Sequence, residues 1–218
     1  MRSATDTALV PYITMREGEE AAPANLLIYP GTGVLYYADE RPEDRDRYKV
    51  LWARCSSNPL DARQQPTGEP RWKFMHPGRQ RSTMERLLCQ VCAQPARTPL
   101  GLVFISAAGV TDPVEPTVLT DQPPVCARHI RTVLKLCPAL EHDPMVMLAT
   151  SAPLYGVHGV LYGLKGRSVE PLVHPDEPMA FAHLQTPTML ASKLVRRLSS
   201  FRVVDPDELV HNLAAAAA

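Results

Sequence analysis

The chain has 218 residues, and its 23 basic and 23 acidic side chains cancel to a formal net charge of zero. A chain of this length can bury a hydrophobic core without disulfides, as one large or two small domains. Zero net charge excludes a whole-protein field that would draw the chain to DNA, RNA or an anionic membrane.

Cysteine usage and hydropathy indicate the compartment. Four of the five cysteines lie between Cys89 and Cys137, which favours thiols and a metal over a disulfide framework. No apolar run approaches the roughly 18 residues of a transmembrane helix, and no charged and then apolar leader follows Met1. We therefore expect a cytoplasmic protein with no membrane partner. The excess of arginine over lysine is associated with bacterial genomes rich in GC.

Residues 1–70 are predicted to form an antiparallel β region. Asn25–Tyr29 and Val34–Ala38 are rich in β-forming residues and are joined by a Pro-Gly-Thr-Gly segment, which is a strong hairpin signal. Residues 8–15 and 48–54 also have strand composition. We expect these four segments to make one antiparallel sheet.

Two segments are predicted to be polar and exposed because of their composition. Residues 39–47 interleave acidic and basic side chains, which indicates a solvated loop or a short helix. Residues 56–70 are rich in Ser, Asn, Pro, Gln and Gly without periodicity, which indicates a surface loop.

The segment from Arg71 to Arg81 combines aromatic side chains, a histidine and several arginines. Aromatic rings stack on bases and arginines bind phosphates, so contact with nucleic acid or another anionic ligand is one interpretation. In the alternative, Trp72 and Phe74 pack on the module that follows and the arginines are solvated. The candidate ligand-binding residues are Trp72, His76, Arg79 and Arg81. Residues 80–88 are predicted to form a short helix.

Two pairs of soft ligands follow. Cys89 and Cys92 are separated by two residues, as are Cys126 and His129, and this spacing lets both members of a pair bind one ion. Three cysteines and one histidine are a standard tetrahedral zinc set. The sequence therefore predicts a structural Zn²⁺, with His129 the least certain ligand: if water replaces it, the site has the open position of a catalytic centre.

The elements around these ligands have a recognisable order. Leu102–Ile105 is an apolar run typical of a buried strand, and residues 108–116 are predicted to turn it back onto 117–119 as a hairpin. Ile130, Val133 and Leu134 then mark the apolar face of a helix whose first turn carries the second ligand pair. Knuckle, hairpin and helix resemble a treble-clef zinc module over residues 88–140.

The helix of the second ligand pair also has a basic face. Arg128, Arg131 and Lys135 recur at spacings of three and four, so they share one side. That side can lie along a phosphate backbone, although surface helices commonly show a basic stripe for solubility alone.

The C-terminal part is predicted to contain strands and then helices. Strands are expected near residues 144–149, 157–164, 169–174 and 179–184. Residues 187–198 are predicted to form a helix, because Leu190, Leu194 and Leu198 recur every four residues after a Thr-Pro start. A last helix is expected to begin after Asp205.

Together these predictions give an α+β fold: an antiparallel sheet, a central treble-clef zinc module and C-terminal helices. The predicted regions are 1–70, 71–140 and 141–218, packed as one continuous body.

A wider resemblance rests on several motifs. Tyr37-Ala-Asp-Glu40, Val50-Leu-Trp52, His76-Pro-Gly-Arg-Gln-Arg81 and Leu88-Cys-Gln-Val-Cys92 resemble those of an uncharacterised group of actinobacterial zinc-knuckle proteins. In that group the second pair is commonly another CxxC, so His129 departs from the pattern. The resemblance implies a metal site and no reaction.

Two functions remain open. The first is a zinc-stabilised binding protein that contacts nucleic acid or a protein partner through Trp72–Arg81 and the basic helix face. The second is an enzyme of bacterial specialised metabolism that acts on a small molecule, with structural zinc and a cleft between the N-terminal sheet and the C-terminal part. Its polar groups would be His76, Arg79, Arg81, Tyr155 and His158.

The sequence lacks residues that two known classes of zinc enzyme require, so it belongs to neither class. Nucleoside deaminases need an HxE motif, and the chain has none. HNH nucleases need a histidine on the hairpin before the helix, and residues 100–124 contain no histidine.

Overall fold

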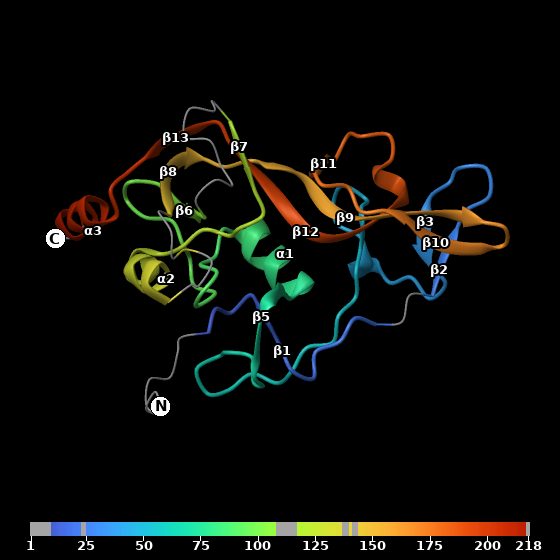
Figure 1. Cartoon of the computed structure of the whole chain (residues 1–218), viewed down its shortest axis with the longest axis horizontal. Helices are drawn as coiled ribbons and strands as arrows, with labels where there is room; N and C mark the ends of the chain where they lie inside the picture. Colours follow the sequence, from blue (N-terminus) through green and yellow to red (C-terminus); the bar gives the residue numbers. More distant parts are fainter. Residues whose placement is uncertain (1–9, 23–24, 108–116, 137–139, 141–143, 217–218) are drawn as a thin grey trace.

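The computed structural model describes residues 10–22, 25–107, 117–136, 140 and 144–216. These residues form a mixed α/β protein with mainly antiparallel sheets (Figure 1). Within them lie three α-helices: α1 (Pro77–Arg86), α2 (Ile130–Leu136) and α3 (Pro206–Ala215). The prediction of a fold that mixes helices with antiparallel strands is therefore confirmed.

The largest sheet is built on two long antiparallel strands, β9 (Leu154–Lys165) and β12 (Met189–Leu198). Gly159 of β9 permits their close approach, since a Cβ there would lie 2.3 Å from the carbonyl oxygen of Leu190. The other strands are β10 (Ser168–Val173) and β11 (Met179–Ala180) beside β9, and β4 (Leu51–Trp52) and β7 (Val118–Thr120) beside β12. β4 pairs with β12 in parallel.

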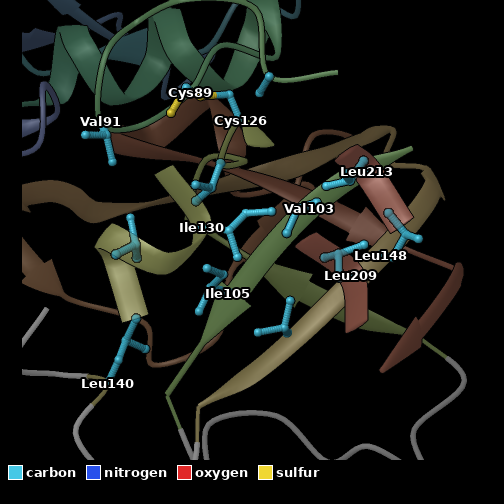
Figure 2. Close-up of a cluster of buried hydrophobic side chains, with 14 residues drawn as sticks. Cys89, Val91, Val103, Ile105, Cys126, Ile130, Leu140, Leu148, Leu209 and Leu213 are labelled. Atoms are coloured by element: carbon cyan, nitrogen blue, oxygen red, sulfur yellow. The ribbon is translucent and has the colours of Figure 1, made fainter. Parts of the chain in front are cut away.

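A second sheet has the order β13–β8–β6 and forms the core beneath the helices. Its strands are β6 (Leu102–Ser106), β8 (Met145–Ser151) and β13 (Ser200–Val203). All five residues of β6 are buried. Figure 2 shows Val103 and Ile105 of β6 in one apolar cluster with Leu209 and Leu213 of α3, and Cys89 and Cys126 belong to the same cluster.

Two small ribbons complete the description. β2 (Leu26–Ile28) and β3 (Leu35–Tyr37) form the predicted hairpin. β1 (Thr14–Arg16) pairs antiparallel with β5 (Pro70–Met75), and this β1–β5 ribbon lies below α1 in Figure 1.

Helix α1 is fixed to the large sheet by two buried polar side chains. The Gln80 carboxamide accepts a hydrogen bond from the Leu194 amide (2.8 Å) and donates to the Leu194 carbonyl (2.8 Å), as a neighbouring strand would. The Arg196 guanidinium donates to the carbonyls of Met84 and Glu85 at the end of α1. A cation is favourable there because the last helical carbonyls carry partial negative charge.

Three sequence predictions about the sheets and helices are wrong. The N-terminal strands do not form one four-stranded sheet, because β1 pairs with β5, β2 pairs with β3 and β4 joins β12. The strands on either side of residues 108–116 do not pair as a hairpin, because β6 pairs with β8 and β7 with β12. Residues 108–116 themselves lie outside the described residues.

The third error concerns residues 187–198, which form strand β12 and not a helix. A spacing of four residues is ambiguous, because Leu190, Leu194 and Leu198 share one face both of a helix and of a strand. Pairing with β9, β4 and β7 stabilises the strand. The remaining C-terminal helix, α3, begins as predicted after Asp205, whose side chain accepts hydrogen bonds from the amides of Asp207 and Glu208.

The sheets also connect the three predicted regions. β4 of the first region pairs with β12 of the third, and β6 of the second pairs with β8 of the third. Hydrogen bonding therefore crosses both predicted boundaries.

Candidate metal centre and binding surface

The first ligand pair lies on a tight knuckle directly after α1. The helix ends at Leu87, which has the left-handed φ of 53°, and the chain then reverses. Ala93 after the knuckle is also left-handed (φ 56°), and its amide donates to the Cys89 carbonyl (2.9 Å). This turn brings the side chains of Cys89 and Cys92 to one side of the loop.

The second ligand pair begins the α2 segment. Cys126 precedes the short 3₁₀ helix η2 (Ala127–His129), which continues directly into α2. The amide of Gln90 in the knuckle donates to the Pro124 carbonyl (3.0 Å), and the Val125 amide donates to the Val103 carbonyl of β6 (2.8 Å). The backbone thus holds the two ligand pairs together.

The four predicted ligands do converge. One potential ligand atom from each of Cys89, Cys92, Cys126 and His129 lies within 4.8 Å of all the others. Nδ1 of His129 is 3.2 Å from the Cys126 sulfur and 3.7 Å from the Cys89 sulfur, and the sulfurs of Cys92 and Cys126 are 4.0 Å apart. Cys89 is fully buried and Cys126 nearly so. Such a cluster can hold a metal ion.

The thiols of the cluster shift one another's pKa values. The hydrogen bond from Cys89, reinforced by His129, lowers the pKa of Cys126 although burial opposes this. The same hydrogen bond, together with burial, raises the pKa of Cys89. Because metals bind thiolates, a metal ion in the cluster would take the place of the thiol protons.

The four candidate ligand-binding residues have different surroundings: His76 and Arg81 line one pocket, and that lining does not include Trp72 or Arg79. His76 is buried as the N-cap of α1, and its Nδ1 accepts from the Arg79 amide (3.3 Å). Its Nε2 lies 3.0 Å from the Ser56 carbonyl. Since a carbonyl only accepts, Nε2 carries the proton in the neutral ring, and burial, ahead of the charge of Arg79, lowers the pKa of His76. Both ring nitrogens are thus occupied.

Arg79 is buried in an ion pair with Glu19, a residue that the sequence analysis did not single out. Nη2 of Arg79 lies 2.7 Å from Glu19, and it also donates to the Thr14 carbonyl. Glu19 is fully buried and accepts further hydrogen bonds from the amides of Arg16 (2.7 Å) and Asn58 (3.2 Å). This pair fastens α1 to the β1–β5 ribbon, and no sequence spacing indicated it.

The Glu19–Arg79 pair predicts an acid-sensitive stability. Burial opposes ionisation, but hydrogen bonds from Arg79, Arg16 and Asn58 lower the pKa of Glu19 from near 4.5 to about 2. Because the folded-state pKa is depressed, the stabilisation is complete above pH 4.5 and is lost as the pH falls towards 2, in all about 3 kcal/mol.

The check is urea unfolding between pH 6 and 3 for the wild type and Glu19→Gln. Both carry the same metal cluster, so the difference between their unfolding free energies isolates Glu19. That difference should shrink as the pH falls through 4.5, and a constant difference would contradict the assignment.

Arg81 and Trp72 occupy different surroundings. The Arg81 guanidinium lies 4.8 Å from the centre of the Trp52 ring and pairs with Glu85 (3.1 Å). It lines a pocket of about 620 Å³ with His76 and Cys55, in which three arginines face three carboxylates. Trp72 lies on β5 and is 49% exposed.

The exposed part of β5 is a bulge, here defined as residues Arg71–Phe74. Thr14 pairs with Met75 and Arg16 with Pro70, so β5 advances five residues while β1 advances two. The extra residues are pushed outward, and all four side chains are exposed. About half of the Trp72 and Phe74 side-chain surfaces is open to solvent.

The β5 bulge is linked to the metal knuckle through β1. The amides of Tyr12 and Ile13 donate to the carbonyls of Val91 and Gln90 (3.1 and 3.3 Å). Tyr12 and Ile13 directly precede β1, and the amide of His76, directly after β5, donates to the Ile13 carbonyl (2.9 Å). Hydrogen bonds thus join the knuckle to one end of the β1–β5 ribbon.

The basic face predicted on the second ligand segment is solvent-accessible. Arg128, Arg131 and Lys135 are all exposed. Arg131 pairs with Asp207 of α3 at 3.1 Å, where both side chains are largely solvated.

The cleft considered for an enzyme has a partial counterpart. A pocket of about 380 Å³ lies between residues 29–49 and 181–187, and its lining includes Tyr48, Phe181 and His183. Tyr155 and His158 belong to β9, and no hydrogen bond or ion pair among the described residues joins them to His76, Arg79 or Arg81. Of the five polar groups proposed for catalysis, His76 and Arg81 line the pocket of about 620 Å³, and that lining does not include Arg79, Tyr155 or His158.

Among the described residues, no helix has the length and apolar character needed to span a bilayer.

Comparison of the chain with protein-family profiles, with curated proteins and with solved structures found no match.

Proposed function

We propose that Cys89, Cys92, Cys126 and His129 bind one structural zinc ion. Zinc–ligand bonds of about 2.0–2.3 Å in a tetrahedron place neighbouring ligand atoms about 3.5–3.8 Å apart. The separations of 3.2, 3.7 and 4.0 Å in the cluster are close to this range. Four protein ligands leave no open position, which is typical of a structural site and not of a catalytic one.

The treble-clef assignment is part of the same proposal. A knuckle carries two ligands and the start of a helical segment carries the other two, which is the treble-clef order. The strands between them pair with other partners, so the proposal rests on the knuckle and helix alone. Membership of the actinobacterial zinc-knuckle group likewise stays a prediction.

We further propose that the protein binds nucleic acid, and the β5 bulge is the observation that carries this. Its residues are alternately cationic and aromatic, none is acidic, and all are exposed. Exposed aromatic rings and guanidinium groups together favour a ligand with both flat bases and phosphates. The basic face of η2 and α2, through Arg128 and Lys135, offers a second set of phosphate contacts.

Zinc would support this function by holding the binding surface in place. The knuckle accepts hydrogen bonds from Tyr12 and Ile13 just before β1, and the bulge lies on β5, the strand paired with β1. Without the ion, the knuckle loses the bonds that define its turn. The hydrogen bonds from Tyr12 and Ile13 to the knuckle would then weaken, and β5 would lose its ordered neighbour.

Replacing Arg71 and Lys73 by glutamine is expected to weaken binding of the zinc-loaded chain to a mixed-sequence oligonucleotide. Each lost phosphate contact should reduce the slope of log affinity against log salt by about 0.7–0.9. Fluorescence anisotropy at several salt concentrations measures both quantities.

The matched control is the double change Lys165→Gln and Arg167→Gln, which removes two exposed charges at the turn between β9 and β10. It should leave the salt slope nearly unchanged. Absence of binding at low salt, or an equal loss in both double variants, would contradict the proposal.

A further inference from the structure

The β5 bulge differs from the usual surfaces that read duplex DNA, because two of its four exposed side chains are aromatic. Trp72 is 49% exposed and Phe74 is 52% exposed. We infer that the ligand of the bulge is single-stranded nucleic acid, with one base stacked on Trp72 and a neighbouring base on Phe74. This inference rests on the proposed nucleic-acid binding and narrows it to one kind of strand.

The two rings are neighbours along the bulge, with Lys73 alone between them in sequence, and both are open to solvent. Two separate rings can each stack on a base only if the two bases are no longer stacked on each other. A single strand can separate its bases in this way at small cost, whereas a duplex must unstack and unpair them.

The cations of the bulge complement the rings. The Arg71 guanidinium lies 4.9 Å from the centre of the Phe74 ring, so it covers part of that ring and leaves the rest for a base. Lys73 lies between the two aromatic residues in sequence and is exposed. Its exposed ammonium group is available to contact the phosphate backbone.

Duplex DNA is a poorer fit to the same residues. A two-stranded ribbon can enter the major groove, but there it reads base edges with polar side chains such as Arg, Lys, Asn and Gln. Trp72 and Phe74 offer ring faces, and the faces of paired bases are hidden inside the duplex. Stacking on these residues therefore requires bases that are already exposed.

A folded protein partner is also a poorer fit. The cores of protein interfaces are depleted of charged residues, and Lys in particular is rare there. Two of the four residues of the bulge are cations, and one of them separates the aromatic residues. Burial of such a surface against a protein core would remove Lys73 from water without a counter-charge, whereas a phosphate provides one.

The test uses the full zinc-loaded chain and three labelled probes of one mixed sequence of about 20 nucleotides: single-stranded DNA, single-stranded RNA and duplex DNA. The variants are Trp72→Leu, which keeps apolar area without an aromatic face, and Trp72→Phe, which keeps the face. Leu184→Ala, at the most exposed large apolar side chain of the described residues (94%), is the matched control. Both positions are exposed, so the thermal unfolding temperature should not change in any of the three variants.

We expect the single strands to bind about tenfold or more tightly than the duplex. Trp72→Leu should weaken single-strand binding by about tenfold, in keeping with one lost base stack, while Trp72→Phe and Leu184→Ala stay near wild type. Emission provides an independent signal: of the two tryptophans, Trp52 is buried and Trp72 is exposed, so strand-induced quenching should disappear in Trp72→Phe.

Three results would overturn the inference. If the duplex binds as tightly as the single strands, or if Trp72→Leu binds as Trp72→Phe does, base stacking is wrong while salt-dependent nucleic-acid binding stands. If no probe binds at low salt, the proposed function fails together with the inference. A difference between RNA and DNA would support the stacking site and show which polymer it prefers.

Discussion

Replacing Cys89 by serine is expected to abolish metal binding and to unfold at least the unit formed by the knuckle, β6 and α2. Structural zinc sites contribute about 10–16 kcal/mol of apparent binding free energy at neutral pH. The entire stability of a domain is about 5–15 kcal/mol. Cys89 is fully buried in the same apolar cluster as residues of β6 and α3 (Figure 2). Loss of the ion therefore removes the metal–ligand bonds and also weakens the packing of this part of the core.

The measurement is metal content together with circular dichroism on thermal unfolding. Cys55→Ser is the matched control, because Cys55 is a half-buried free cysteine outside the four-residue cluster. It should keep the metal and shift the unfolding free energy by about 1 kcal/mol or less. A soluble Cys89→Ser chain that unfolds at the wild-type temperature would contradict the structural role of the metal.

The second large effect is expected at the buried ion pair of Glu19 and Arg79. Replacing Arg79 by methionine should lower the unfolding free energy by about 3–5 kcal/mol, because it leaves a carboxylate buried without its counter-charge. Glu19 still accepts two backbone hydrogen bonds, which limits the loss. Urea unfolding of the zinc-loaded chain measures it.

A double variant separates the charge effect from the loss of packing. Glu19→Met combined with Arg79→Met removes both charges and should be less destabilised than the sum of the single changes. Arg131→Ala is the surface control, since Arg131 and Asp207 are 66% and 84% exposed, and should cost less than about 1 kcal/mol. Additive single effects at Glu19 and Arg79 would show that the two charges are not coupled.

The metal cluster was the feature most accessible from sequence. Its signal is local: two residues separate the members of each pair, and a knuckle or a helix start can be inferred from the flanking residues. The structure brings these four side chains together although 33 residues separate Cys92 from Cys126. The residue types and their spacing therefore predict the cluster even when the pairing of the strands between Cys92 and Cys126 is unknown.

The strand pairing could not be predicted because its signals are not local. The leucines of residues 187–198 fit a helix and a strand equally well, and the choice depended on β9, which lies far away in the sequence. The strands predicted at residues 102–105 and 117–119 are present, as Leu102–Ser106 and Val118–Thr120. Their true partners, β8 and β12, follow later in the chain.

The Arg71–Arg81 segment shows a second reason why the sequence did not predict the site fully. Composition singled out Trp72, His76, Arg79 and Arg81 as a group, but the boundary between β5 and α1 divides them. The histidine caps the helix, Arg79 enters the core, and only the residues before the boundary project into solvent as a bulge. Burial of a charged residue depends on a partner, and Glu19 lies 60 positions from Arg79.

Elemental analysis of the purified chain, with thermal unfolding before and after chelation, tests the central claim most directly. The account predicts one zinc ion per chain, and it predicts that chelation abolishes the cooperative unfolding transition and that added zinc restores it. A purified chain that contains no metal, or that unfolds at the same temperature with and without the ion, would contradict a structural zinc centre at Cys89, Cys92, Cys126 and His129.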